Sequence, residues 1–419
     1  MPLTRNQIVI IGAGILVVVV IGSLFFFGGS DTQKPPEVVL TFFGTSAERV
    51  MGNLINSYKS LRPNVKINYI QFPAANYERE LINAIAAGRG PDIFEIGDTW
   101  LPKHGDKMMP ASASQFPVTA LDLFPQAVSQ AFEANGAVYA LPLTLDTLAL
   151  FYNKDIFDAQ GIVFPPATWE EFQKIIPTLR EMDGAGRITR PAAAIGGSEA
   201  SVLHAIEILN LLFLQTGAPS IIEGGEIRFG DKGLEALNFY LNFSNSLSAA
   251  YTWDERLGSS FDNFADGNVA MMFGFAEDLP FLKERAPFLN IGIAATPQVQ
   301  KNQTVSSARF AGMAVSRSSR ASSWAWDFVI QAATNEALAE PVAIATGQSP
   351  ALRSLIGARL GDKEKAVFAR QALTARLWLE PDPTEVRQIL SRAIKDVLSG
   401  KLSSRQALTQ AEEGINLLR

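Results

Sequence analysis

The chain has 419 residues, too many for one ordinary compact core, so two or three domains or lobes are expected. Hydrophobic residues make up 47% and charged residues 19%, which excludes general disorder. The net charge of -6 without any run of Lys and Arg argues against nucleic acid, and the absence of cysteine excludes disulfides, thiolate metal sites and a lipidated N-terminal cysteine.

An uncharged apolar segment, Ile8 to Phe27, lies near the N-terminus. As a helix it would be roughly 30 Å long, which matches the hydrocarbon core of a bilayer. Because Arg5 precedes the segment, the positive-inside rule keeps that end in the cytoplasm and sends the rest outside. A cleaved signal peptide is the alternative, but its apolar region is usually shorter and ends in an A-x-A type site. We predict an uncleaved single-pass anchor in the cell membrane and a polar spacer, together residues 1–37.

An α/β pattern begins at Val38, where short apolar runs alternate with helical periodicity. The order strand, helix, strand, helix, strand predicts a parallel sheet. Thr45 or Ser46 is expected to cap the first helix. The expected elements are a strand at 38–43, a helix through Val50 and Tyr58, a strand at 65–71, a helix from Asn76 that Gly88 and Gly90 stop, and a strand at 92–96.

A second series of elements follows the tight-turn pair Asn135-Gly136. The run from Leu141 to Thr144 is a candidate crossing between lobes. Thr168 and Glu171 have the spacing of a capping box that opens a helix. Further expected elements are strands at 148–152, 269–273, 290–294 and 313–315, helices at 204–214 and 234–243, and a mainly helical part from Ser322 that closes with helices at 386–398 and 408–417.

The sequence lacks the motifs of several common classes of enzyme. The histidines, His104 and His204, stand in unrelated contexts, so no metal or other cofactor is predicted. Neither a G-x-x-x-x-G-K-S/T loop nor a G-x-S-x-G elbow occurs. A glycosidase would need two carboxylates across a sugar, and spacing singles out no pair among the 42 Asp and Glu residues. Aromatic and acidic residues at strand ends suit a sugar, whose rings offer an apolar face and a rim of hydroxyls.

Several segments together resemble the carbohydrate-type extracellular solute-binding family, family 1, whose members are maltose-binding-protein-like. The run from Tyr139 to Asp155, which ends in Tyr-Asn-Lys-Asp, is followed by Pro165 to Phe172 with its Thr-Trp-Glu-Glu helix start. Ala87 to Ile93, Phe264 to Met272 and the helical C-terminus support the same resemblance.

The resemblance implies the type II periplasmic-binding-protein fold, in which hinge-linked α/β lobes enclose a ligand cleft. The lobes would cross near Leu141 to Thr144 and return near Phe310 to Ala314. The N-terminal lobe would then hold residues 38–143 and about 313–350, and the C-terminal lobe 144–312 and about 351–419.

The resemblance also implies positions for the ligand-binding residues. Asp98 and Trp100 stand where the family often places a hydroxyl-binding carboxylate and a stacking ring, and Asp146 where it has a sugar-binding carboxylate. Phe275 replaces a Trp that is common in relatives. The full set of candidate ligand-binding residues is Phe43, Gly44, Thr45, Asp98, Trp100, Asp146, Glu199, Trp253, Gly274, Phe275, Gln348 and Trp378.

The predicted function is capture of a sugar or oligosaccharide outside the cytoplasm and delivery to the permease subunits of an ABC importer, by a monomer with no catalytic residues. Three alternatives stay open: a binding protein for another polar solute, a carbohydrate-active enzyme, and a sensor built on the same lobes.

Overall fold

The computed structural model describes residues 36–218, 226–301, 304–362 and 365–418. The chain divides into two units, Met1–Val38 and Val39–Arg419, and the second contains the folded lobes. The predicted anchor from Ile8 to Phe27 lies outside the described residues. Among those described, no helix combines the length and apolar character needed to cross a bilayer.

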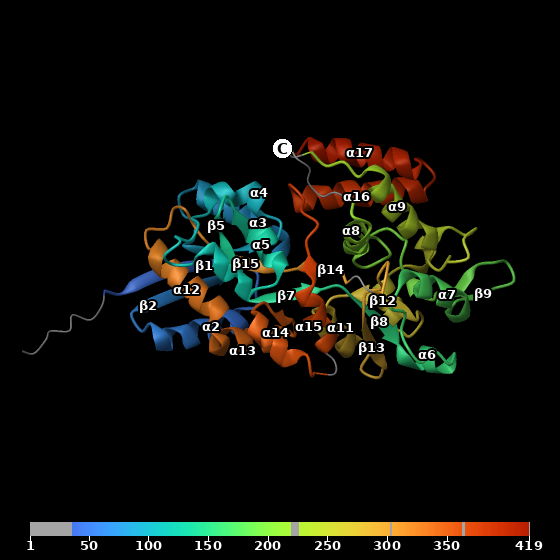
Figure 1. The fold of residues 1–419 in the computed structure, drawn as a ribbon, viewed down its shortest axis with the longest axis horizontal. Coiled ribbons are helices and arrows are strands. Elements are labelled where there is room, and N and C mark those ends of the chain that lie inside the picture. The colour runs from blue at the N-terminus through green and yellow to red at the C-terminus, as the bar shows by residue number, and fades with distance from the viewer. Residues whose placement is uncertain (1–35, 219–225, 302–303, 363–364, 419) are drawn as a thin grey trace, which may run out of the picture. The chain divides into compact units, whose positions relative to one another are not determined.

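The N-terminal lobe is built on a five-stranded sheet in the order β2-β1-β3-β15-β6 (Figure 1). β1 and β3 are parallel, but β15 runs antiparallel to both β3 and β6. The predicted parallel pairing is confirmed for β1 and β3, and the late return of the chain adds β15 as an antiparallel strand. The strands are β1 (Val38–Gly44), β2 (Val65–Gln71), β3 (Ile93–Gly97), β6 (Ala140–Pro142) and β15 (Ala311–Val315).

Helices with one apolar face cover this sheet. In α2, Val50, Met51, Leu54 and Tyr58 are buried and recur at helical spacing. The predicted cap by Thr45 or Ser46 is wrong: the N-cap is Ala47 and makes no side-chain bond, while the Thr45 hydroxyl donates to Glu95. The helices of this lobe are α2 (Glu48–Leu61), α3 (Ala74–Ala86), α4 (Leu101–His104), α5 (Gln126–Phe132), α12 (Ser322–Thr334) and α13 (Glu336–Thr346).

The C-terminal lobe is built on a four-stranded sheet in the order β11-β12-β8-β13. One apolar core joins this sheet to the helices around it and to the C-terminal helix pair, from which Val386, Leu390 and Ile415 enter the core. The sheet strands are β8 (Ala149–Asn153), β11 (Ala193–Ala194), β12 (Met271–Gly274) and β13 (Ile291–Ala295). The helices are α6 (Lys154–Ala159), α7 (Trp169–Leu179), α8 (Ala205–Thr216), α9 (Gly230–Leu241), α10 (Ser260–Ala265), α11 (Asp278–Arg285), α16 (Pro383–Leu398) and α17 (Ser404–Asn416). Two further helices, α14 (Arg353–Arg359) and α15 (Ala366–Leu373), pack against each other.

Half of the predicted capping box is confirmed: the Thr168 hydroxyl oxygen accepts from the Glu171 N–H at 3.1 Å, whereas the Glu171 carboxylate accepts from the Ala167 N–H at 2.9 Å. The expected turn at Asn135-Gly136 is also present, with both residues at positive φ between β4 (Glu133–Ala134) and β5 (Ala137–Val138). This conformation is the one that a tight hairpin turn of type I′ requires. A second short hairpin pairs β9 (Glu181–Met182) with β10 (Ile188–Arg190).

A small sheet lies where the chain passes between the lobes, in the order β16-β7-β14-β17. β6 leads through Leu143 into β7, and β14 leads through Phe310 into β15. The two passages are antiparallel neighbours, because Arg309 of β14 is opposite Asp146 of β7. We call these two paired passages, residues 140–147 and 306–315, the hinge ribbon. The strands of the small sheet are β7 (Thr144–Thr147), β14 (Ser306–Arg309), β16 (Ser349–Pro350) and β17 (Ala375–Arg376).

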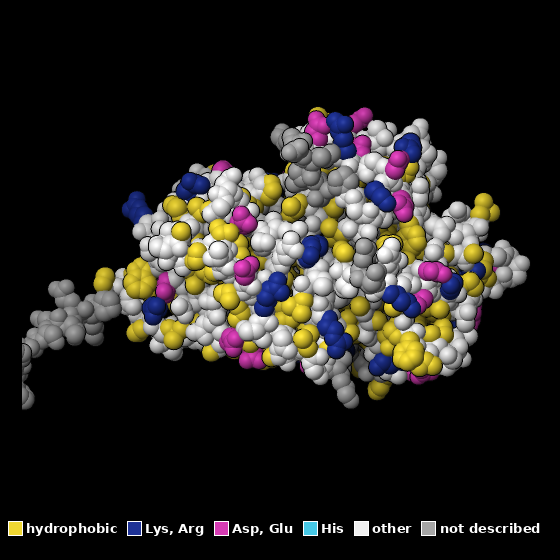
Figure 2. All heavy atoms as spheres, in the orientation of Figure 1, with side chains coloured by type: hydrophobic (Ala, Val, Ile, Leu, Met, Phe, Trp, Pro, Cys, Tyr) yellow, Lys and Arg dark blue, Asp and Glu magenta, His cyan; other side chains and the backbone are white. Residues whose placement is uncertain are grey.

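Figure 2 shows one face of the molecule, on which Lys and Arg side chains are interspersed with Asp and Glu. The face drawn has no concentration of cations of the kind that a nucleic-acid-binding surface needs. This agrees with the net charge of -6 for the whole chain.

Candidate ligand site

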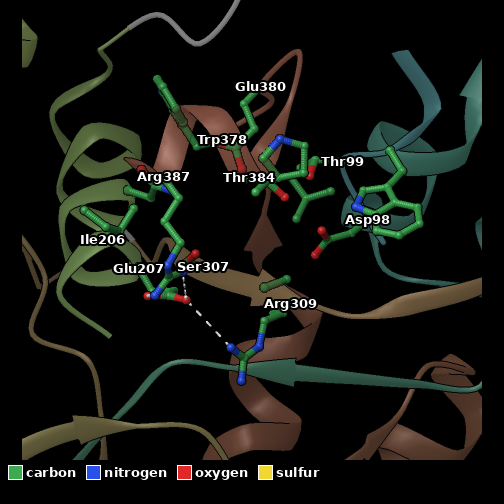
Figure 3. Close-up of a pocket in the computed structure, with 15 residues that line it drawn as sticks. Asp98, Thr99, Ile206, Glu207, Ser307, Arg309, Trp378, Glu380, Thr384 and Arg387 are labelled. Carbon is green, nitrogen blue, oxygen red and sulfur yellow. Dashed lines mark hydrogen bonds and ion pairs between the residues drawn. The ribbon is translucent and has the colours of Figure 1, made fainter. Parts of the chain in front are cut away.

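A cavity of about 300 Å³ lies between the lobes (Figure 3). This volume is at the lower end of the range for small-molecule pockets. Its walls come from both lobes and from the hinge ribbon, so a bound molecule would contact all three. The lining residues are Asp98, Thr99 and Trp100 after β3, Ile206, Glu207 and Asn210 of α8, Ser307, Ala308 and Arg309 of β14, and Leu377, Trp378, Glu380, Pro383, Thr384 and Arg387 between β17 and the first turns of α16.

The N-terminal wall of the cavity is the turn that follows β3. The Trp100 ring is nearly parallel to Tyr77, with 6.2 Å between the ring centroids. It also packs so closely on Gly97 that a Cβ there would lie 2.9 Å from the indole. Both contacts fix the orientation of an aromatic face that lines the cavity.

Asp98 is held in the same wall by the hinge ribbon. Its carboxylate accepts from the Phe310 N–H at 3.0 Å, and its own N–H donates to the Phe310 carbonyl at 3.1 Å. Burial raises the pKa of Asp98 to about 7, although the Phe310 N–H and the charge of Arg309 act in the opposite direction. Figure 3 shows the carboxyl group facing the cavity.

The C-terminal wall holds an ion-pair network. Arg387 of α16 lies 2.7 Å from Glu207 of α8 and also pairs with Glu199. Arg309 of β14 pairs with Glu277, and its Nη1 lies 3.6 Å from the Glu207 carboxylate. Burial opposes ionisation of Glu207, but Arg387, followed by smaller effects of His204 and Arg309, lowers its pKa. Glu207 is therefore an ionised carboxylate shared by two guanidinium groups.

Three polar groups in this wall lack a hydrogen-bond partner. The Trp378 Nε1 and the Asn210 Oδ1 are buried atoms without one. The Glu380 side chain is 9% exposed, and no described residue provides it with a hydrogen bond or an ion pair. Burial, then the charges of Asp98 and Glu207, raise the pKa of Glu380 well above its usual range. Because buried polar groups in folded proteins are normally satisfied, these groups are available to a ligand.

Of the candidate residues from the sequence, Asp98, Trp100 and Trp378 line the cavity. Trp378 is 3% exposed and packs on Phe213 and Phe229, with centroid separations of 5.3 and 5.7 Å. It is therefore part of the core of the C-terminal lobe as well as of the cavity wall.

The candidates at the end of β1 lie away from this cavity. The N–H and hydroxyl of Thr45 donate to Glu95 at 2.7 and 2.8 Å. A Cβ on Gly44 would lie 2.6 Å from the Glu95 carboxyl carbon, so Gly44 lets that side chain approach. Phe43 is buried and packs on Phe72 with 4.9 Å between ring centroids.

Asp146 is 1% exposed and does not line the cavity. Its carboxylate accepts from the N–H groups of Thr147 at 2.8 Å and of Ala276 and Glu277 at 3.1 Å each. Burial raises its pKa to about 7. In this structure the side chain joins the hinge ribbon to the turn after β12.

Three further candidates contact the ion-pair network of the cavity wall without lining the cavity. Glu199 pairs with Arg387. Phe275 is fully buried, and the guanidinium carbon of Arg309 lies 4.0 Å from its ring centroid. Gln348 donates to Glu277 at 3.3 Å and accepts from the Thr144 hydroxyl at 2.6 Å.

Two candidates belong to the interior of the C-terminal lobe. Trp253 is fully buried and donates its indole N–H to Ser201 at 3.1 Å. Gly274 admits the Phe151 ring, which would lie 2.7 Å from an added Cβ.

Sequence reasoning missed most of the C-terminal wall, namely Glu207, Asn210, Arg309, Glu380 and Arg387. A partial signal was present: Glu380 follows Trp378 by two residues, just before the N-cap Asp382 of α16. Arg309 precedes the expected return crossing directly. The pairing of α8 with α16, which brings Glu207 and Arg387 together, has no local signal.

The two histidines have separate partners. His104 lies 2.9 Å from Glu78, and His204 lies 2.8 Å from Asp278. Within the described part of the chain, no group of three or more His, Cys, Asp or Glu residues is placed to hold a metal ion.

Comparison with known proteins places this geometry among binding proteins. Residues 53–366 match the family described as bacterial extracellular solute-binding protein. The maltotriose-binding protein of Pyrococcus abyssi is 30% identical over 129 residues, which are 30% of this chain and 27% of that protein. The multiple sugar-binding protein of Streptococcus mutans is 22% identical over 63% of both chains. The chain thus spans less than two thirds of the length of each of these relatives.

Solved structures share the fold at low sequence identity. The sugar-binding protein MalE of Xanthomonas citri has a TM-score of 0.75 at 20% identity, covering 91% of this chain and 97% of that one. The cyclic alpha-maltosyl-1,6-maltose binding protein of Arthrobacter globiformis has a TM-score of 0.76 at 18% identity, covering 91% and 99%. The two-lobed α/β fold expected from the sequence is confirmed.

Proposed function

Since the chain belongs to the bacterial extracellular solute-binding family, we propose that it captures a carbohydrate in the cavity between its lobes and delivers it to the permease of an ABC importer. The observation that carries this proposal is the composition of the cavity. Trp100 and Trp378 offer aromatic surface from opposite lobes, and Asp98, Asn210 and Glu380 offer polar groups that hydroxyls can bind. Membership of an extracellular family puts the binding domain outside the cytoplasm.

Closure of the lobes around the solute is part of the proposal. Two contacts already join the N-terminal lobe to the segment that leads into α16: Lys103 Nζ lies 2.6 Å from Asp382, and the Leu377 N–H donates to Gln130 at 3.2 Å. A solute that contacts both walls favours the closed form, because only that form offers every contact at once. The closed form would dock on the permease.

The boundaries of the lobes belong to the same proposal. We assign residues 38–143 and about 313–350 to the N-terminal lobe, and 144–312 and about 351–419 to the C-terminal lobe. The shared core of the C-terminal helix pair with β8 and β12 supports this assignment.

Attachment to the membrane is proposed from the sequence alone. Ile8 to Phe27 would span the bilayer once, and the binding domain would act as a monomer on the outer side. Fractionation of cells that express the full chain tests this: the protein should stay with membranes after a carbonate wash. Recovery of a shortened chain in the soluble fraction would contradict it.

Thermal unfolding of the full chain with a panel of mono- and oligosaccharides tests the main proposal. A saccharide at a hundredfold its dissociation constant should add about 2.7 kcal/mol of stability without being converted. X-ray scattering of the same samples should show a smaller radius of gyration with the bound sugar. Product formation that disappears in Asp98→Asn or Asp146→Asn would establish an enzyme instead.

A further inference from the structure

The cations around the cavity are already paired, whereas two of its carboxyl groups are not. Arg309 and Arg387 are shared among Glu199, Glu207 and Glu277, so two guanidinium groups face three carboxylates. The next cation, Lys103, lies 2.7 Å from Glu78 and 2.6 Å from Asp382. Among the described residues, none of these cations is within ion-pair distance of Asp98 or Glu380.

Asp98 and Glu380 project into the same cavity from different walls (Figure 3). Asp98 accepts from the Phe310 N–H at 3.0 Å, but no described cation lies within ion-pair distance of its carboxyl group. Glu380 is 9% exposed and has no described donor. A buried carboxyl group without a donor is costly, and the proximity of a second one increases this cost.

A metal ion is a poor explanation for this pair. Within the described ranges no cluster of three potential ligands surrounds either carboxyl group, and hard cations take six or more oxygen ligands. An ammonium group needs only two or three acceptors and no fixed coordination geometry. The unpaired carboxyl groups, the Asn210 Oδ1 in the same cavity and the shortage of cations therefore fit an organic ammonium group.

We propose that the solute is a saccharide with a protonated amine, such as an amino sugar, whose ammonium group binds between Glu380 of the C-terminal wall and Asp98 of the N-terminal wall. This inference rests on the proposed function and adds a charge to the ligand. Trp100 and Trp378 would contact the sugar ring. Because the ammonium group contacts both walls, it would also help to close the lobes.

Matched pairs of ligands test the inference on the full chain by calorimetry at neutral pH. The probes are glucose, N-acetylglucosamine and glucosamine, with cellobiose, diacetylchitobiose and the fully deacetylated disaccharide for a longer ligand. We expect each free amine to bind about tenfold or more tightly than its neutral counterparts, and the difference to shrink at high salt.

Glu380→Gln should abolish the preference for the amine by weakening the binding of the free amines more than that of the neutral sugars, because an amide can still bind a hydroxyl but carries no charge. Glu385→Gln is the matched control, because Glu385 is an exposed carboxylate in the first turn of α16, outside the cavity lining. It should keep the preference. Circular dichroism and thermal unfolding of both variants verify that they are folded.

The outcomes separate this inference from the proposed function. Equal binding of neutral and amino sugars, or a preference that survives Glu380→Gln, overturns the inference and leaves carbohydrate capture intact. Putrescine binding as tightly as glucosamine would show that the amine alone is recognised and would overturn the saccharide part. Failure of every saccharide to bind would overturn the proposed function and this inference with it.

Discussion

The two walls of the cavity are built in different ways. The N-terminal wall is three consecutive residues, Asp98 to Trp100, at the end of a buried strand. The C-terminal wall brings together α8, β14 and the start of α16, which span Ile206 to Arg387 in the sequence. The first wall depends on one strand end, whereas the second exists only after the whole lobe has folded.

The two walls also shift the pKa values of their carboxyl groups in opposite directions. Asp98 and Glu207 are both partly buried, yet the pKa of Asp98 is raised to about 7 and that of Glu207 is lowered. Arg387, followed by His204 and Arg309, accounts for the lowered pKa of Glu207. Burial alone therefore does not determine which carboxyl groups of the cavity are ionised; the arginines of the C-terminal wall contribute as well.

The largest expected effect is a loss of stability when the indole ring of Trp378 is removed from the C-terminal wall. Trp378→Ala should lower the free energy of unfolding by about 3–5 kcal/mol, because the ring is buried against Phe213 and Phe229. Trp100→Ala should cost less, since its ring is only partly buried and lines the cavity. Urea unfolding measures both. Equal losses would show that the two walls are integrated into the fold to the same degree.

Removal of a shared cation should have the second largest effect on stability. Arg387→Ala leaves the partly buried Glu207 with Arg309 at 3.6 Å and His204 at 4.0 Å, and should lower stability by about 1–3 kcal/mol. The Arg387 side chain is 44% exposed, which keeps this value below that of a fully buried pair. Urea unfolding against Arg392→Ala, an exposed arginine of the same helix, isolates the ion pair. No difference between the variants would contradict the network.

The pH dependence of stability should distinguish Asp98 from Glu207. The pKa of Asp98 is raised by folding from 3.8 to about 7, so its contribution is fully present below pH 3.8 and is lost as the pH rises through about 7. The titration of Asp98 contributes at most about 1.4 kcal/mol per pH unit to the slope of the free energy of unfolding against pH. Asp98→Asn should remove this decline, as seen by urea unfolding from pH 4 to 8. An unchanged slope would mean that Asp98 ionises freely.

The smallest effect concerns the contact between the walls. Lys103→Ala removes a partly exposed ion pair with Asp382 and should cost only about 0.2–1 kcal/mol, less at high salt. Scattering should detect more of the open form in the variant without ligand. Lys59→Ala, an exposed lysine of α2, is the control. If Lys103→Ala leaves the radius of gyration unchanged, the ion pair does not contribute to closure.

The sequence predicted what depends on local pattern. The strand at Val65–Gln71 appears with the predicted ends, and the cap at Thr168 is made by residues three positions apart. The cap at Thr45 failed because its hydroxyl is taken by Glu95, fifty positions away. Such a partner is set by strand pairing between β1 and β3, which helical periodicity does not encode.

The same limit applies to the site. Asp98 and Trp100 were implied by the family resemblance, and they follow a strand, where open α/β sheets bind ligands. Arg309 and Arg387 contact Glu207 only through the packing of β14 and α16 on α8. No spacing in the sequence therefore predicts these contacts. Asp146 was placed beside the crossing correctly, but its hydrogen bonds to Ala276 and Glu277 depend on a turn 130 residues away.

The hinge ribbon would restrict the proposed movement of the lobes. Its two passages are hydrogen-bonded to each other, with Ala308 opposite Thr147 and Met313 opposite Leu141. A paired ribbon bends across its flat face far more readily than it shears, so the lobes should rotate about one axis instead of swivelling freely. Arg309 lies on that ribbon at the C-terminal side, so each rotation would move its charge relative to Asp98 of the N-terminal wall. Mechanical and electrostatic changes would thus occur in a single step.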